Sequence, residues 1–375
     1  MADAFEVLLD AHLLQSQAAD RYRFHDLLRV YAAERAEAEE TQQDRDAAVF
    51  RILTWYVYTA ETAARVISPQ HTRVPLGPTG SSVHPLSFAS LEEALAWCES
   101  ERAGMVAATR LAAESELYDL AWKLPAAAMS FFFRRSQWAD WVVTHQIGLE
   151  SARKRGDSLA EAWMLNNLGM AFGEQRMEEA VGCFERSLAI YREIGDVPGE
   201  TRAANNVAKA YFELRRFGEA LDAARQSLAI QRLAGNRYGE GVALGNLGDA
   251  CRELGRFDEA IECLGQALVI FRELGDQHAE ADALSDLGGV LLGLDRVEDA
   301  LGCLRDSLAI WRAIGERHGE AATLRRLGVA WRHAARPEQA RESLSAALGI
   351  FEALGDHVQA AESRMWLEAL SQGVS

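Results

Sequence analysis

A period of 40 residues is the feature of this 375-residue sequence that most constrains its fold. A glycine followed by an acidic or amide residue returns at that spacing, at Gly195-Asp196, Gly235-Asn236, Gly275-Asp276, Gly315-Glu316 and Gly355-Asp356. Self-similarity at a fixed period of this size is typical of a solenoid, in which each unit buries its apolar face only against its neighbours. A solenoid offers an extended surface instead of a closed cleft, so the period favours binding over catalysis.

One unit, residues 236–275, has the pattern of two helices. From Leu244 onwards, apolar or small side chains recur at i, i+3, i+4 and i+7, which places them on one helical face. Gly255 interrupts that pattern. A second apolar face runs from Ala260 to Phe271 and ends before Gly275, a residue suited to a left-handed C-cap. The sequence therefore predicts an antiparallel helical hairpin in each unit.

Small residues where the two helices of a unit meet make the unit resemble the tetratricopeptide repeat (TPR). The matching positions are Leu247-Gly248, Ala260 and Ala267, with the family's first-helix aromatic residue at Tyr211 and Trp331. The resemblance covers about residues 157–370 and implies an all-α fold, an α-α superhelix whose first helices line a concave groove. We expect five repeats of about 40 residues in 157–355 and a capping helix in 356–375.

Upstream of the array the period weakens. Residues 90–156 are expected to form degenerate, TPR-like helical hairpins, and Ser90 to Glu93 has the form of a capping box that opens the first helix. Residues 41–89 are expected to be a helical linker followed by a loop rich in proline and glycine. An aromatic cluster in 90–156 is either the core of a hairpin or an exposed docking patch, and it comprises Phe131, Phe132, Phe133, Trp138 and Trp141.

Residues 1–40 have a different character. We expect a winged-helix-like remnant there, with a short helix over 5–14 and a strand over 21–24. The string from Tyr22 to Ala32 resembles the end of the winged-helix module in STAND-class (NB-ARC) signalling ATPases, which include antibiotic-regulatory transcription factors. In that family the motif at Phe24-His25-Asp26 places its histidine against the phosphate of a bound nucleotide. The resemblance also implies a TPR array that senses partners.

One part of that family's machinery has no counterpart in the sequence. No G-x-x-x-x-G-K-[ST] loop occurs, so nothing is expected to cradle phosphates, and the DNA-binding portion of the regulators is missing too. The chain therefore resembles the C-terminal region of such a regulator without its ATPase and DNA-binding parts. We expect no cofactor. His25 is then a vestigial nucleotide-contact position, or a packing or capping residue.

Candidate binding residues follow from the groove that the TPR resemblance implies. Polar side chains recur two and three positions before the small residue of the first helix and one position after it. A side-chain amide both donates and accepts, so stacked asparagines can grip the backbone of an extended peptide. The alternative is that these asparagines bridge neighbouring helices. The candidates at these positions are Asn166, Asn167, Asn205, Asn206, Lys209, Asn246, Asp249, Asp286, Arg325 and Arg326, and Arg202 is a further charged candidate early in the groove.

Composition disfavours several classes of function. A net charge of −17 argues against direct nucleic-acid binding, which depends on cations that neutralise phosphates. No apolar run has the length of a membrane helix and no signal-peptide pattern opens the chain, so we expect a cytoplasmic protein without membrane contact. No catalytic constellation recurs, and the five cysteines include no C-x-x-C pair, so we expect neither an enzyme nor a metal site.

Two functions of different classes remain. The leading hypothesis is a non-catalytic TPR module that binds a protein or peptide in the concave groove and is the sensor or partner-binding part of a bacterial transcription or signalling regulator. The alternative is an allosteric control element that packs on and restrains a separate STAND-type nucleotide-binding subunit. Pairing of two chains into a homodimer through the second helices stays open.

Overall fold

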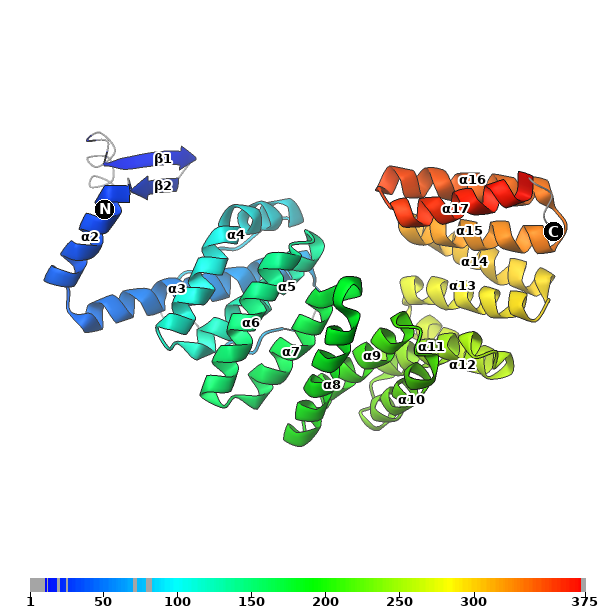
Figure 1. Cartoon of the computed structure of the whole chain (residues 1–375), viewed down its shortest axis with the longest axis horizontal. Coiled ribbons are helices and arrows are strands. Elements are labelled where there is room, and N and C mark those ends of the chain that lie inside the picture. Colours follow the sequence, from blue (N-terminus) through cyan, green and yellow to red (C-terminus); the bar gives the residue numbers. More distant parts are fainter. Residues whose placement is uncertain are drawn as a thin grey trace. The chain divides into compact units, whose positions relative to one another are not determined.

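The chain divides into two compact units, Met1–Arg155 and Gly156–Ser375, which Figure 1 shows coloured along the sequence. Apart from one two-stranded hairpin, every regular element of the described residues is a helix. The all-α fold class is therefore confirmed. The computed structural model describes residues 11, 13–18, 21–24, 26–69, 73–78 and 83–371.

The first unit opens with a β-hairpin and a helix. Strand β1 (Leu14–Ala18) pairs antiparallel with β2 (Arg21–Phe24), and α2 (Asp26–Glu39) follows. The strand expected over 21–24 is confirmed, whereas the helix expected up to Leu14 is wrong there, because that residue begins β1. Residues 5–10 and His25 lie outside the described residues. The winged-helix remnant and its vestigial nucleotide-contact position therefore stay predictions.

Four long helices complete this unit, and they are α3 (Gln42–Ile67), α4 (Leu91–Glu114), α5 (Tyr118–Arg134) and α6 (Trp138–Arg155). The capping box expected at the start of α4 is confirmed. Ser90 Oγ accepts from the Glu93 N–H at 3.2 Å. The Glu93 carboxylate in turn accepts from the Ala89 N–H at 2.8 Å. The two side chains thus satisfy backbone donors that a helix start leaves without partners.

The aromatic cluster of α5 and α6 divides between core and surface. Phe131, Phe132 and Trp141 are at most 1 % exposed. Phe133 and Trp138 are 57 % and 42 % exposed, and the Trp138 ring stacks on that of Trp141 with the centroids 5.6 Å apart. The core interpretation therefore holds for three of the five rings, and the other two extend the cluster to the surface.

The second unit consists of five helical hairpins followed by one helix, each packed against the next along the chain (Figure 1). The first helices, called A helices below, are α7 (Ser158–Phe172), α9 (Val197–Glu213), α11 (Arg237–Glu253), α13 (Gln277–Gly293) and α15 (Arg317–His333). The second helices, called B helices, are α8 (Met177–Ile194), α10 (Phe217–Leu233), α12 (Phe257–Leu274), α14 (Val297–Ile314) and α16 (Pro337–Leu354). A 3₁₀ turn (Gly173–Arg176) joins α7 to α8, and the last helix is α17 (His357–Ser371).

Left-handed residues terminate the helices of this unit. The glycines that follow four of the B helices have φ between 68° and 75°, and they are Gly195, Gly275, Gly315 and Gly355. Between α11 and α12, Gly255 has a φ of 72°. The equivalent residues of other hairpins are not glycine but still have φ of 55° to 58°, and they are Arg215, Asp295 and Ala335. A side chain disfavours this conformation, so these three turns carry some strain.

Small residues on the A helices let the B helices approach closely. A Cβ atom on Gly248 would lie 2.7 Å from Leu264 Cγ, and one on Gly328 would lie 2.5 Å from Leu344 Cγ. The leucine therefore fills the space that a side chain at the glycine would need. The close approach expected at Gly248 is confirmed.

An arginine in the last turn of a B helix pairs with a glutamate in the first turn of the next A helix. The Nε–Oε1 distances are 2.7–2.9 Å, in the pairs Arg192–Glu200, Arg232–Glu240, Arg272–Glu280 and Arg312–Glu320. Each charge also lies at the helix end where it complements the macrodipole. These residues therefore stabilise the junctions between repeats.

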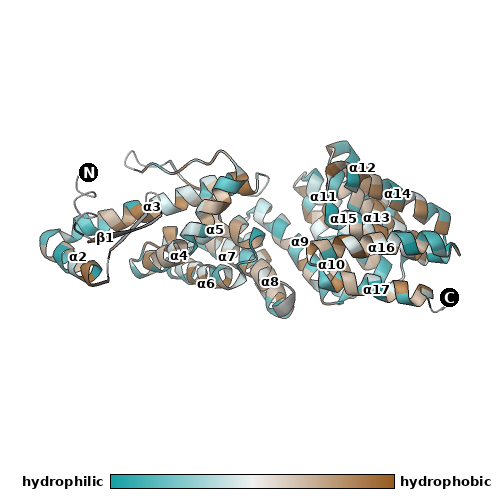
Figure 2. Cartoon of the chain, turned by 90° about the horizontal axis from the view of Figure 1, so that it is seen from above, coloured by the Kyte–Doolittle hydropathy of each residue, from teal (hydrophilic) through white to brown (hydrophobic). Residues whose placement is uncertain are grey.

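Apolar and polar residues alternate around the helices in Figure 2, as expected for helices that bury one face. On α12, for example, Leu264 and Phe271 are buried while Glu262 and Glu273 are exposed. Within the described residues, no helix combines the length and the apolar composition that crossing a membrane requires.

Candidate binding surface on the A helices

The predicted binding residues lie on the A helices, and neighbouring A helices contact one another along the second unit. We call the polar surface made by these side chains the A face. Its residues are Asn166 and Asn167 on α7, Arg202, Asn205, Asn206 and Lys209 on α9, Asn246 and Asp249 on α11, Asp286 on α13, and Arg325 and Arg326 on α15.

In the first two repeats the asparagines bridge helices. Asn206 Nδ2 donates to Asn166 Oδ1 at 2.9 Å. Asn166 and Asn167 are only 7 % and 4 % exposed. Asn205 Oδ1 accepts a hydrogen bond from the Ser227 hydroxyl on α10. These contacts use part of the hydrogen-bonding capacity of the asparagines, and they hold the A face in a fixed arrangement.

Two residues of the A face have no polar partner among the described residues. Lys209 is exposed and Asn246 is half-buried, and neither has a hydrogen-bond or ion-pair partner within the part of the chain that the structure describes. Arg202 instead lies over the ring of Trp163, with its guanidinium carbon 5.1 Å from the ring centroid. Lys209 and Asn246 are therefore the positions best able to bond a ligand.

A charged cluster occupies the A face farther along the array. Arg326 Nη1 lies 2.7 Å from Asp286 Oδ1 and 2.8 Å from Ser285 Oγ. Burial and the nearby Asp286 carboxylate raise the pKa of Asp249 well above its usual range and the pKa of Asp282 to about 6. Burial disfavours the Arg326 cation, but the surrounding carboxylates outweigh it and raise the pKa of that guanidinium. The cluster thus couples three consecutive A helices electrostatically.

Arg325 faces the opposite neighbour. Its Nη1 lies 2.7 Å from Glu362 Oε2 on α17, and burial lowers the pKa of its guanidinium. Its Nε is buried and has no hydrogen-bond partner among the described residues. The two adjacent arginines therefore do not act together, because Arg326 joins α15 to α13 and Arg325 joins α15 to α17.

The chemistry of the A face is that of non-covalent recognition. It offers an amide, an ammonium group and carboxylates on successive helices. Among the described residues, no group of three or more His, Cys, Asp and Glu side chains has an arrangement that could hold a metal ion. Cys251, Cys263 and Cys303 of the second unit are free thiols.

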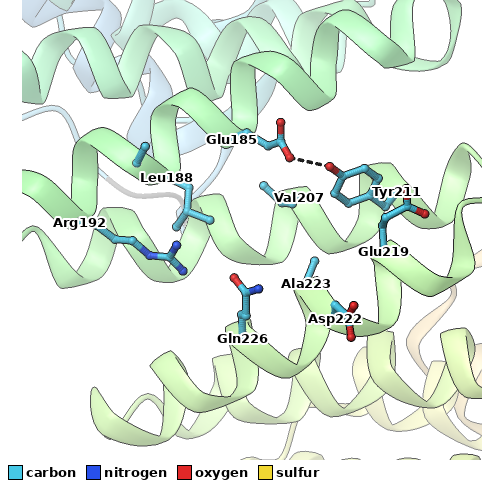
Figure 3. Close-up of a pocket in the computed structure, with 10 residues that line it drawn as sticks. Glu185, Leu188, Arg192, Val207, Tyr211, Glu219, Asp222, Ala223 and Gln226 are labelled. Atoms are coloured by element: carbon cyan, nitrogen blue, oxygen red, sulfur yellow. Dashed lines mark hydrogen bonds between the residues drawn. The ribbon is translucent and has the colours of Figure 1, made fainter.

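The sequence prediction missed a second site, a cavity of about 320 Å³ lined by two B helices and the A helix between them. It lies between α8, α9 and α10, and Figure 3 shows the side chains that line it, among them Glu185, Tyr211 and Asp222. A signal for it was present in the sequence. At the 40-residue spacing, Glu185 occupies the position of Arg225 and Arg305, so its charge is opposite to that of the two other charged residues at this position.

A tetratricopeptide repeat model matches residues 160–233, 200–273, 239–313 and 280–353, which together span more than half of the sequence. This chain belongs to the tetratricopeptide repeat family. Regulatory protein AfsR of Streptomyces coelicolor is 30 % identical over 256 residues, which cover 56 % of this chain and 25 % of AfsR. Regulatory protein AfsR of Streptomyces griseus is 31 % identical over 209 residues, covering 54 % and 21 %. The TPR chain thus spans about a quarter of the length of these relatives.

Solved structures show the same fold at low sequence identity. A STAND protein with a tetratricopeptide repeat sensor from Pyrococcus horikoshii has 16 % identity and a TM-score of 0.56, covering 99 % of this TPR chain and 55 % of that protein. A Rap protein complexed with Competence and Sporulation Factor has 14 % identity and a TM-score of 0.53, covering 75 % and 80 %. The apo form of RapI has 17 % identity and a TM-score of 0.52, covering 67 % and 97 %.

Proposed function

We propose that the chain is a non-catalytic TPR module that binds a protein or peptide across its A face. In this proposal it is the sensor or partner-binding part of a bacterial transcription or signalling regulator. The observation that carries the proposal is the alignment of polar side chains on consecutive A helices, held by bonds such as Asn206–Asn166. A pre-organised polar surface binds with a smaller loss of side-chain entropy than a mobile one.

The unused donors of the A face suit an extended polypeptide. The Asn246 amide can donate to a peptide carbonyl and accept from a peptide N–H, and Lys209 can pair with a carboxylate. A Rap protein of similar fold is complexed with Competence and Sporulation Factor, which supports ligand binding by this type of solenoid. The sequence similarity to AfsR supports a role in regulation.

Affinity capture from the source cell's lysate tests the proposal. The variant is Lys209→Ala/Asn246→Ala, because neither side chain has a structural partner whose loss would unfold the array. The matched control is Arg341→Ala/Ser345→Ala, which removes one cation and one polar group from the exposed surface of α16. We expect the variant to lower recovery of the partner about tenfold or more and the control to leave it unchanged. Equal recovery by both would refute the proposal.

A second candidate function is allosteric control of a separate nucleotide-binding subunit. The observation that favours it is an exposed apolar face on α2, where Leu27, Val30 and Tyr31 are 77 %, 54 % and 58 % exposed. Their spacing of i, i+3 and i+4 places them on one side of the helix. In this candidate, the face packs on a STAND-type subunit and completes its winged helix.

The same capture experiment separates the two functions when a third variant, Leu27→Asp/Tyr31→Asp, is added. Allosteric control predicts a captured partner that carries a P-loop, is lost by this variant and is kept by Lys209→Ala/Asn246→Ala. Peptide recognition on the A face predicts a partner that is lost by Lys209→Ala/Asn246→Ala and kept by Leu27→Asp/Tyr31→Asp.

A further inference from the structure

The cavity between α8, α9 and α10 has an apolar floor and an acidic rim. Leu188, Val207 and Ala223 form the floor and are 8 %, 5 % and 9 % exposed. Glu185 extends over one side from α8, while Asp222 lies on α10 (Figure 3). The lining side chains come from the B helices α8 and α10 and from Val207 and Tyr211 of the A helix α9. None of them belongs to the A face, so the proposal below does not depend on the function proposed for that surface.

Two of the rim carboxylates lack a cationic partner. Tyr211 donates its hydroxyl to Glu185 Oε1 at 2.5 Å, the contact marked in Figure 3. Glu219 is paired with Arg216, whose Nη2 lies 2.7 Å away. No ion pair joins Glu185 or Asp222 to a cation in the described part of the chain. The rim therefore carries uncompensated negative charge beside apolar carbon.

The one arginine that lines the cavity is directed elsewhere. Arg192 lies at the end away from Tyr211 in Figure 3, and its Nε pairs with Glu200 at 2.8 Å. It therefore leaves the acidic end of the cavity open to another cation.

Two of the equivalent grooves between later repeats hold one of the chain's own arginines, whereas the corresponding residues of the other repeats are Gly265 and Ser345. One repeat along, Arg225 takes the place of Glu185, and its Nη2 lies 3.7 Å from Glu259 Oε2 on α12. Three repeats along, Arg305 takes that place and lies over the ring of Trp331, with its guanidinium carbon 4.9 Å from the centroid. Trp331 stands where Tyr211 stands in the cavity. In one of these two grooves the arginine contacts a carboxylate of the next B helix, and in the other it contacts an aromatic ring.

We propose that the cavity binds an arginine side chain of a partner polypeptide. The methylene groups of that side chain would lie on Leu188 and Val207, and its guanidinium would lie between Glu185 and Asp222.

Arg216 already lies over the Tyr211 ring, with its guanidinium carbon 4.7 Å from the centroid. The equivalent ring, Trp331, contacts Arg336 at 5.1 Å as well as Arg305, so a ring in this groove can contact two guanidinium groups at once. Arginine is favoured over lysine because its planar guanidinium can stack on the Tyr211 ring as the second such group and bond a carboxylate through two N–H groups. The partner is a polypeptide because the fillers of the two equivalent grooves are arginines borne on a helix.

Fluorine NMR of protein labelled with 3-fluorotyrosine tests the proposal at the site. The sequence has eight tyrosines, and the spectrum of Tyr211→Phe assigns the signal of interest. The probes are a capped pentapeptide with arginine between alanines, its leucine counterpart, and N-acetyl-arginine amide. We expect a saturable shift of the Tyr211 signal with the arginine peptide and none with the leucine peptide.

Two variants with the same charge change complete the test. Glu185→Arg places in the cavity the residue that fills the next groove, so it should weaken binding of the arginine peptide about tenfold or more. Glu262→Arg makes the same charge change at an exposed position of α12, in the next groove. It should leave binding of the arginine peptide unchanged. Circular dichroism confirms that each variant is folded.

Three results would overturn the proposal. The first is the absence of a saturable shift with the arginine peptide. The second is equal binding by wild type and Glu185→Arg. The third is a saturable shift with N-acetyl-arginine amide and none with the arginine peptide, which would assign the cavity to a small-molecule cation and exclude a polypeptide.

Discussion

The guanidinium of Arg326 on α15 lies 2.7 Å from the carboxylate of Asp286, forty residues earlier on α13. The same Nη1 also donates to Ser285 Oγ at 2.8 Å. Asp249 and Asp282 are close enough to raise the pKa of that guanidinium. One side chain therefore joins consecutive A helices and neutralises the most acidic part of the A face.

Arg326→Ala should lower the free energy of unfolding by about 1 kcal/mol at pH 7, since the pair is partly exposed. Without the cation, the carboxylates of Asp249 and Asp282, whose pKa values are already raised, would repel Asp286. Protonation relieves that repulsion, so the loss should be smaller at pH 5 than at pH 7. Urea unfolding followed by circular dichroism at the two pH values measures it.

Asp286→Asn in the Arg326→Ala background is the control for that prediction. Removing the second charge of the pair should restore part of the lost stability, because fewer unpaired carboxylates remain. The loss of unfolding free energy could instead be equal at both pH values and not reduced in the double variant. That result would show that Arg326 acts through packing alone.

Much of the fold could be predicted because it rests on local chemistry that recurs every 40 residues. Glycines at B-helix ends, such as Gly275, adopt the left-handed conformation that no other residue adopts so easily, and Gly248 leaves room for Leu264. The first β-strand was less predictable. Residues 14–18 have no apolar alternation, so the local sequence pattern does not predict that they pair with 21–24.

The contacts of the candidate site were harder to predict than its positions. Asn206 bonds Asn166 rather than Asn167, the residue at the equivalent place in the first repeat. The N-caps Asp157 and Asp196 are 39 residues apart, so this bond joins positions that the repeat pattern does not align. Arg326 likewise bonds Ser285, one position before its equivalent residue Asp286. The cavity was missed because it depends on the charge of one residue, Glu185, at a position where the residue type varies from repeat to repeat.

Gly328→Ala should destabilise the second unit by about 1–3 kcal/mol, because the new methyl group would overlap Leu344 and approach the Ala340 carbonyl. Gly349→Ala, on the B helix of the same hairpin, is the matched control. A Cβ atom there meets nothing within 4 Å, so better helix propensity should stabilise the protein by up to about 1 kcal/mol. Thermal unfolding compares the two, and a shift in the same direction would contradict the packing role of Gly328.

Ala335→Gly should stabilise the turn between α15 and α16 by about 1 kcal/mol, because Ala335 has a φ of 55° that glycine adopts without a steric penalty. The reciprocal change, Gly255→Ala, should destabilise the equivalent turn between α11 and α12 by a similar amount. Urea midpoints measure both. The explanation fails if Ala335→Gly is no more stable than wild type.

His145 should make the first unit sensitive to mild acid. It is fully buried on α6, its Nδ1 lies 3.0 Å from the Trp141 carbonyl oxygen, and burial lowers its pKa to about 3. The unfolded chain has the ordinary pKa of about 6.5, so it binds the proton first as the pH falls. The stability contributed by neutral His145 is present above pH 6.5 and decreases by about 2 kcal/mol between pH 7 and pH 5.

Urea unfolding of wild type and His145→Phe at the two pH values checks this prediction. The variant removes the titrating group but retains an aromatic ring beside Trp141. It should therefore lose less stability between pH 7 and pH 5 than wild type does. An identical pH dependence in the two proteins would mean that His145 is accessible to protons in the folded state.

Site-specific photo-crosslinking tests most directly whether the A face is the surface that binds a polypeptide. The crosslinker p-benzoylphenylalanine is placed at Gly245, next to Asn246 on α11, where an added Cβ atom meets nothing within 4 Å, or at Ser345 on the exposed surface of α16. Both positions leave the Asn246 and Lys209 side chains in place. Each protein is irradiated in lysate from the source cell, and adducts are identified by mass spectrometry. We expect a reproducible polypeptide adduct at position 245 and none at position 345. Adducts at 345 with none at 245 would contradict recognition on the A face.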